Sequence, residues 1–223
     1  MSYEMVERGP VVSGSRELAR QAAASAGISD DPDRELVARW QLGDERAFEQ
    51  LVERHQTRVF RLLMRMMGNR EEAEDVAQET FLSLYRHGRR FRHEARFSTF
   101  VYRVASNAAL NRRRTLGRTR KRIQKLAVRQ EAGDDLPGAP RDPEDATSGG
   151  ELTAHVQKAL ATLQPSLRMP VVLYDIEGLA YAEIAKILGI AEGTVKSRIH
   201  RARQALRAEL RELLAGAIEG ATP

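Results

Sequence analysis

Residues 181–203 read YAEIAKILGIAEGTVKSRIHRAR, and this stretch predicts a helix-turn-helix. Apolar side chains recur at helical intervals in its second half and form one narrow stripe: Val195, Ile199, Ala202 and Leu206. The polar residues Lys196, Ser197, His200, Arg201 and Gln204 point away from that stripe. The shorter first helix offers Ile184, Ala185 and Leu188 to the stripe, and Gly189 suits the turn. In such a pair the second helix lies in the major groove of DNA.

The alternative interpretation is an ordinary helical hairpin with a solvated basic face. Two features favour DNA binding instead. No acidic residue falls between Val195 and Ala208, and the second helix begins with the small residues Gly193 and Thr194, which allow close approach.

Composition narrows the class of protein. The chain has 223 residues, enough for one large or two small domains, with 42% hydrophobic residues, 5% aromatic residues and a net charge of +5. This balance favours a helix-rich protein with a polyanionic partner. No apolar run approaches the length of a membrane span and no secretory signal is evident, so we expect a cytoplasmic, nucleoid-associated protein without membrane insertion.

Several kinds of chemistry find no support in the sequence. Cysteine is absent, which excludes disulfides, cysteine–zinc sites and thiol catalysis. The five histidines do not cluster with carboxylates, and neither a Walker loop nor a dinucleotide-binding fingerprint occurs. We therefore expect no catalytic residue, no metal site and no cofactor.

The pattern along the chain predicts an all-α protein with two small helical domains. A flexible linker joins them; its part at residues 131–150 is acidic and rich in Gly and Pro, and extends to at most roughly 65–70 Å. The predicted divisions are an N-terminal extension (1–30), a first domain (31–118), the linker (119–150), a second domain (151–215) and a C-terminal tail (216–223).

Helical spacing identifies the core of the first domain. The expected core residues before Gly68 are Trp40, Ala47, Leu51, Val52, Val59, Leu62, Leu63 and Met66. Asn69 and Glu72 then form a predicted capping box for a helix that continues to about His87. That helix buries Ala73, Val76, Thr80, Phe81 and Leu84. On a different face the helix is expected to expose Asp75, Gln78, Glu79 and Leu82. The exposed leucine is either incidental or a docking point for a partner.

The second domain is expected to open with an amphipathic helix that carries Leu152, Val156, Leu160 and Leu163. Pro165 begins the next helix. Pro170 predicts a late helix start or a kink, since an interior proline removes a backbone hydrogen bond.

A basic block follows the acidic helix of the first domain. Fourteen Lys or Arg residues lie between Arg86 and Lys125, opposed only by Glu94, and six of the twelve aromatic residues lie between Phe81 and Tyr102. The aromatic residues could simply be core residues near charge, and Phe81 is assigned to the core. The remainder, in the segment from Phe91 to Phe100, has the mixture that holds single-stranded nucleic acid by stacking in a basic groove.

The chain resembles an extracytoplasmic-function (ECF) sigma factor of the sigma-70 family. Residues 72–81 (EAEDVAQETF) resemble region 2.2, and residues 97–105 (FSTFVYRVA) with Asn107 and residues 112–114 resemble regions 2.3 and 2.4. Residues 177–203 resemble region 4.2. Three features depart from the family pattern: Phe100 where tryptophan is common, Ala191 as a weaker helix cap, and the long N-terminal extension.

The resemblance implies a role in transcription initiation, with core RNA polymerase, promoter DNA and an anti-sigma factor as partners. Asp75, Gln78, Glu79 and Leu82 would dock on the clamp helices of the largest polymerase subunit. The −10 element would be melted and held as a single strand by Arg89, Arg92, His93, Arg96, Phe97, Ser98, Thr99, Phe100, Arg103, Asn107, Asn111, Arg112, Arg113 and Arg114. The −35 element would be read as duplex by Glu192, Thr194, Lys196, Ser197, Arg198, His200, Arg201 and Arg203.

Two other functions are alternatives to a sigma factor. A self-sufficient activator or repressor would need an effector pocket or dimer interface within residues 31–116. A recombinase or nuclease would need a catalytic nucleophile; Tyr102 is the only candidate, and no partner residues surround it in the sequence.

Overall fold

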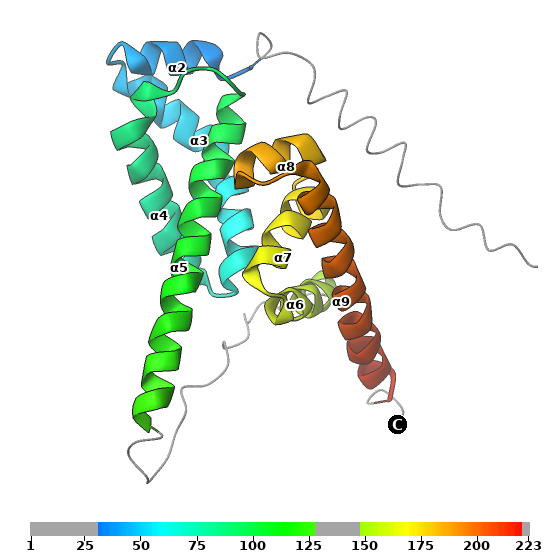
Figure 1. Cartoon of the computed structure of the whole chain (residues 1–223). Coiled ribbons are helices and arrows are strands. Elements are labelled where there is room, and N and C mark those ends of the chain that lie inside the picture. The colour runs from blue at the N-terminus through cyan, green and yellow to red at the C-terminus, as the bar shows by residue number, and fades with distance from the viewer. Residues whose placement is uncertain (1–30, 128–147, 220–223) are drawn as a thin grey trace, which may run out of the picture.

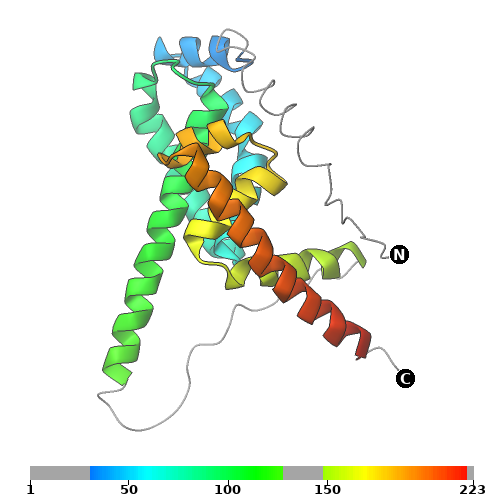
Figure 2. The same cartoon turned by 45° about the vertical axis from the view of Figure 1, so that its right-hand side comes forward.

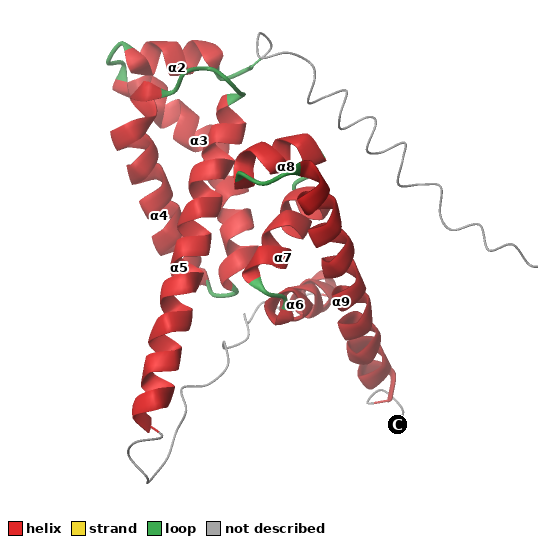
Figure 3. Ribbon diagram, viewed as in Figure 1, coloured by secondary structure: helices red, strands yellow, loops and turns green. Residues whose placement is uncertain are grey.

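The computed structural model describes residues 31–127 and 148–219, and the regular elements in these two ranges are all helices (Figures 1 and 3). They are α2 (Arg34–Gln41), α3 (Glu45–Met67), α4 (Arg70–His87), the 3₁₀ turn η2 (Gly88–Arg90), α5 (Phe97–Ala127), α6 (Ser148–Thr162), α7 (Pro165–Val171), the π-helical turn η3 (Val172–Ile176), α8 (Tyr181–Leu188) and α9 (Glu192–Glu219). The all-α prediction is thus confirmed for the described part of the chain. The predicted N-terminal extension, most of the predicted linker and residues 220–223 lie outside it.

One helix runs past the predicted division between the first domain and the linker. α5 continues to Ala127, nine residues past the expected domain end at 118, and projects beyond the rest of the first domain (Figure 1). Its last turns are made mainly of Arg, Lys, Gln, Leu and Ala, which have high helix propensity, and no proline follows until Pro137. Helix propensity therefore favours continuation of α5 past residue 118.

The first domain is built around α3, which packs against α2, α4 and α5. Gly68 ends α3 in the left-handed conformation (φ 75°), and the Asn69 side chain accepts a 3.1 Å hydrogen bond from Glu72 N. The predicted N-cap is thus confirmed. The predicted reciprocal bond is replaced, because the Glu72 carboxylate accepts from Arg112 Nε instead at 2.6 Å.

Most of the expected core of this domain is buried, with two exceptions. Val52 and Phe81, which were assigned to the core, are only half-buried because they face a groove between α3 and α4.

The second domain contains the predicted helix-turn-helix, formed by α8 and α9. Gly189 adopts the left-handed conformation in the turn (φ 65°), and the stripe residues Val195, Ile199 and Ala202 are buried. Ile184 is buried and the half-buried Ala185 and Leu188 pack against the core as predicted, while Ile187 is a buried residue that the prediction did not include. α8 packs against both α9 and α5, so two of its faces are covered.

Val156, Leu160 and Leu163 pack into the second domain as expected, whereas the Leu152 side chain lies outside the described part. Pro165 begins α7, and Pro170 lies within that helix. The predicted disturbance takes the form of a widened turn: η3 follows at Val172 and closes with a hydrogen bond from Glu177 N to Val172 O of 3.0 Å.

A buried arginine joins the two domains. Arg168, on α7, is 1% exposed and donates from Nη1 to Met66 O of α3 at 2.8 Å. Its Nη2 donates to Ala161 O at 2.5 Å and to Leu163 O at 3.2 Å, near the end of α6. Carbonyls at helix C-termini lack helical partners and carry partial negative charge. Burial, with a smaller repulsion from Arg113, lowers the Arg168 pKa to about 10, so the group stays charged at neutral pH.

Further hydrogen bonds cross the domain interface. Gln157 Nε2, on α6, donates to Met64 O at 3.0 Å, and Tyr102 Oη, on α5, donates to Glu177 Oε2 at 2.7 Å. Burial and the Glu177 carboxylate raise the pKa of Tyr102. Figures 1 and 2 show the result, with α8 beside α5 and α7 beside α3.

Replacing Arg168 by Met should lower the free energy of unfolding by about 2–4 kcal/mol, because buried carbonyls lose their donors. Arg61→Met, at an exposed position of α3, is the control and should change it by less than about 0.5 kcal/mol. Urea unfolding of both variants measures the difference. Equal losses would show that the carbonyl contacts of Arg168 contribute nothing specific.

Candidate nucleic-acid and partner interfaces

The acidic face of α4 is exposed as the sequence predicted. Asp75, Gln78, Glu79 and Leu82 are all open to solvent, and Leu82 is 53% exposed, unusually high for a large apolar residue. The Asp75 carboxylate lies 3.6 Å from Arg112 Nη2 of α5, so its charge is partly balanced.

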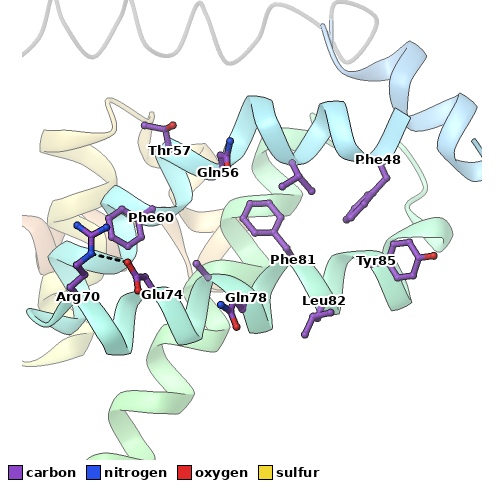
Figure 4. A pocket seen from close by; sticks show the side chains of 12 residues that line it. Phe48, Gln56, Thr57, Phe60, Arg70, Glu74, Gln78, Phe81, Leu82 and Tyr85 are labelled. Atoms are coloured by element: carbon purple, nitrogen blue, oxygen red, sulfur yellow. Dashed lines mark hydrogen bonds and ion pairs between the residues drawn. The ribbon is translucent and has the colours of Figure 1, made fainter. Parts of the chain in front are cut away.

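An apolar groove of about 790 Å³ runs beside this face, between α3 and α4 (Figure 4). Its lining residues are Phe48, Val52, Gln56, Thr57, Phe60, Arg70, Glu74, Ala77, Gln78, Phe81, Leu82 and Tyr85. Gln78 and Leu82 therefore belong both to the predicted docking residues and to the groove.

This groove was not predicted from the sequence, although the sequence carries a signal for it. Apolar residues recur every four positions on α4 at Ala77, Phe81 and Tyr85, and Phe48 and Val52 do the same on α3. Each stripe by itself is typical of core residues. Only the packing of α3 against α4 shows that both stripes line a groove instead.

The predicted −10 residues divide into three groups by burial. Arg89, Arg92, Arg103, Asn107, Asn111 and Arg114 are exposed. His93, Arg96, Ser98, Phe100, Arg112 and Arg113 are half-buried. Phe97 and Thr99 are buried, at 1% and 6% exposure.

Burial changes the interpretation of Phe97. Its ring packs against Trp40 (centroids 6.4 Å apart) and His55 (5.7 Å), so it has no free face on which a base could stack. Both Phe97 and Thr99 belong to the core in this structure, and their contact with DNA stays a prediction. Phe91 and Phe100, stacked on each other at 5.1 Å, are the half-exposed aromatic pair of this surface.

Arg103, Asn107, Asn111 and Arg114 lie on one face of α5, because their spacing of four, four and three matches the helical repeat. The segment before α5 turns sharply: His93 has φ 55°, the only positive φ of a non-glycine residue among those described.

Several of the residues predicted to contact DNA have partners within the protein, among them Arg112 and Arg89. Arg112 Nε donates to Glu72 at 2.6 Å, and this partner raises its pKa. Arg89 forms an ion pair with Glu45 at the start of α3. Arg112 thus ties α5 to α4, with less freedom to contact DNA than its neighbours.

The recognition helix presents Lys196, Ser197, His200 and Arg201 to solvent, whereas Glu192, Thr194, Arg198 and Arg203 are half-buried. Arg203 Nε donates to Asp175 at 3.0 Å and its guanidinium lies 5.1 Å from the Tyr174 ring centroid. The Asp175 hydrogen bond raises the Arg203 pKa. Arg203 therefore fixes α9 against η3, and Lys196, Ser197, His200 and Arg201 are the exposed members of the predicted −35 set.

Within the described residues, no group of His, Cys, Asp and Glu is placed to hold a metal ion. The same part of the chain contains no helix long and apolar enough to span a membrane.

Comparison with known proteins identifies the two domains. The family model for sigma-70 region 2 matches residues 51–119, and the one for sigma-70 region 4 matches residues 154–206. The chain belongs to the sigma-70 family. The resemblance inferred from the sequence is thus confirmed, and the relatives place the chain in its ECF subfamily.

Relatives match over most of the chain. The RNA polymerase sigma-H factor of Pseudomonas aeruginosa is 37% identical over 84% of this chain and 98% of its own length. The ECF RNA polymerase sigma factor SigE of Mycolicibacterium smegmatis is 40% identical over 74% of this chain and 63% of its own. The fold is similar to that of CnrH, solved in complex with the cytosolic domain of CnrY, with a TM-score of 0.61 and 26% identity, covering 82% of this chain and 99% of CnrH.

Replacing Gly88 by Ala should destabilise this sigma factor by about 1–3 kcal/mol, because the new Cβ would lie 2.6 Å from the buried Trp40 ring. Gly117→Ala in α5 is the matched control. It meets no atom within 4 Å and should instead stabilise the helix by about 0.5–1 kcal/mol.

Trp40 is the only tryptophan, so its fluorescence reports on both variants during urea unfolding. Equal effects at the two glycines would contradict the tight packing of Gly88.

Proposed function

We propose that this chain is a dissociable promoter-specificity subunit of RNA polymerase that acts by recruitment and strand capture, without catalysis of its own. The observation that carries the proposal is the occurrence of regions 2 and 4, in that order, in one all-helical chain whose relatives are named RNA polymerase sigma factors. The template and polymerase would place it in the cytoplasm at the nucleoid.

The α4 face and the adjoining groove would dock on the clamp helices of the largest polymerase subunit. The groove offers apolar area for burial, and Asp75, Gln78 and Glu79 supply a polar rim that orients the partner. Leu82 lies where the two surfaces meet, so it would be buried by such a partner.

Region 2 would hold the −10 element. Arg103, Asn107, Asn111 and Arg114 form a polar face on α5 that can follow the backbone of one strand. Stacking on the Phe91–Phe100 pair, at about 1–3 kcal/mol per base, would offset part of the cost of unstacking.

Region 4 would read the −35 element as duplex through Lys196, Ser197, His200 and Arg201. A good bidentate contact to a base discriminates by about 1–3 kcal/mol. Their position in the first turns of α9 resembles that of base-reading side chains in helix-turn-helix proteins.

An anti-sigma factor is proposed as a further partner. The similarity to CnrH, which was solved bound to the cytosolic domain of CnrY, supports this, because the fold is compatible with a regulatory chain bound to it.

The test of the whole proposal is specific initiation by core polymerase on a promoter library in the presence of this chain. Wild-type protein should select a subset of promoters that core polymerase alone ignores. Tight duplex binding in the absence of polymerase, or cleavage of DNA, would favour an autonomous regulator or an enzyme instead.

Replacing Leu82 by Glu should weaken core polymerase binding at least about tenfold, because a charge would enter the apolar part of the contact. Leu42→Glu is the control, since Leu42 is 89% exposed at the end of α2, away from the groove. Affinity for fluorescently labelled core polymerase measures both, and equal affinities would place docking elsewhere.

Arg201→Ala should reduce binding to −35 duplex by about 1–3 kcal/mol without changing core affinity. Arg203→Ala should lower the stability of the domain because the hydrogen bond to Asp175 is lost. Its effect on the selectivity for the duplex should be smaller than that of Arg201→Ala. Holoenzyme binding to matched and mismatched −35 duplexes separates the two effects. A selectivity loss at Arg203 equal to that at Arg201 would show that the reading face is assigned incorrectly.

A further inference from the structure

The N-terminus of α5 is capped by a residue far away in the sequence. Phe97 N donates to Asp31 Oδ2 at 2.7 Å across 66 positions, and Asp31 is 8% exposed. A carboxylate at this place satisfies a free N–H and interacts well with the helix dipole. The start of the −10 helix is therefore set from outside its own segment.

Asp31 is itself held in place by a buried cluster. Its Oδ1 accepts from Asp33 N at 3.1 Å, while the Asp33 carboxylate contacts His55 Nε2 at 2.7 Å and Arg54 Nη1 at 2.8 Å. Burial opposes ionisation of Asp33, but the hydrogen bonds from His55 and Arg54 prevail and lower its pKa. The cap is thus anchored to α3.

A second contact holds the other end of the segment. Gln41 Nε2, at the end of α2, donates to Phe91 O at 2.9 Å and to Arg89 O at 3.2 Å. Gln41 and Asp31 therefore fix the chain on both sides of the turn at His93.

Aromatic packing transmits these two constraints to the surface. The buried Phe97 ring contacts Phe91 with centroids 5.6 Å apart, and Phe91 stacks on Phe100. If the first turn of α5 frayed, the buried edge of the exposed aromatic pair would lose its fixed position. Binding would then have to order the segment as well as capture a strand.

We propose that Asp31 and Gln41 are positioning residues for −10 strand capture. They hold the segment from Arg89 to Phe97 in its binding geometry before DNA arrives, so that little order has to be created on binding. Both residues lie outside the region 2 family match, which begins at residue 51. This inference rests on the proposed function, and it assigns a role in DNA capture to residues that do not themselves contact DNA.

The test uses full-length Asp31→Ala and Gln41→Ala chains, each assembled with core polymerase. The probe is the single non-template strand of a promoter selected by the wild-type chain from the library. Each variant should bind this strand about tenfold or more weakly than wild type, as expected for a misplaced binding group. Core affinity and −35 duplex binding should stay within about twofold.

Asp44→Ala is the matched control, because Asp44 caps α3 through Ala47 N and lies in the same domain without touching the segment. It removes a cap of the same kind, so it tests whether lost stability alone weakens capture. Equal losses of strand binding in Asp44→Ala and Asp31→Ala would overturn the proposal, as would wild-type strand binding in Gln41→Ala.

Different results would contradict the proposed function and the proposed positioning role. If the wild-type chain selects no promoter with core polymerase, the proposed function is wrong. If it selects promoters and the two alanine variants bind the strand as wild type does, only the positioning role is wrong.

Discussion

The arrangement of the two domains of this sigma factor depends on one guanidinium that is hydrogen-bonded to main-chain carbonyls. Arg168 is buried, and its recorded partners are the carbonyl oxygens of Met66, Ala161 and Leu163. Desolvating a cation is costly, and the lowered pKa of Arg168 reflects that cost. The partial negative charge of two helix ends offsets it. Consequently the ends of α3 and α6 are drawn to one point, and α7 is placed against the first domain.

The same contacts bear on how a promoter can be read. In the arrangement of Figure 1, α8 of the helix-turn-helix lies against α5, whose face is proposed to hold the −10 strand. The proposed function addresses two separate DNA elements, so it requires the domains to part. Each polar contact between them would then be exchanged for water. A neutral hydrogen bond contributes only about 0.5–1.5 kcal/mol net and one from a charged group about 1.5–3 kcal/mol, so a partner that binds both domains apart can supply the difference.

Local signals predicted the helices well, whereas the site needed the structure. Gly68, Asn69 and Gly189 end or begin helices through interactions within a few residues, which is why spacing identified them. The sequence left open whether Phe97 is a core residue or a DNA contact, because the neighbours that bury it, Trp40 and His55, lie more than 40 positions away. Arg112 and Arg203 likewise belong to basic runs, yet their acidic partners lie 40 and 28 positions away. The sequence therefore could not show which side chains of these basic runs have partners within the protein.

Most of the hydrogen bonds that join the end of α3 to the second domain are accepted by backbone carbonyls of α3. Arg168 donates to the carbonyl of Met66, and Gln157 donates to the carbonyl of Met64. Any helical residue would present its carbonyl in the same place. Substitutions on the exposed side of this end of α3 can therefore accumulate without loss of the contact, provided that the helix ends where it does. The interface should therefore tolerate substitutions at the acceptor positions of α3, but not at Arg168. In a set of homologues, the arginine should persist while its acceptor positions vary in identity.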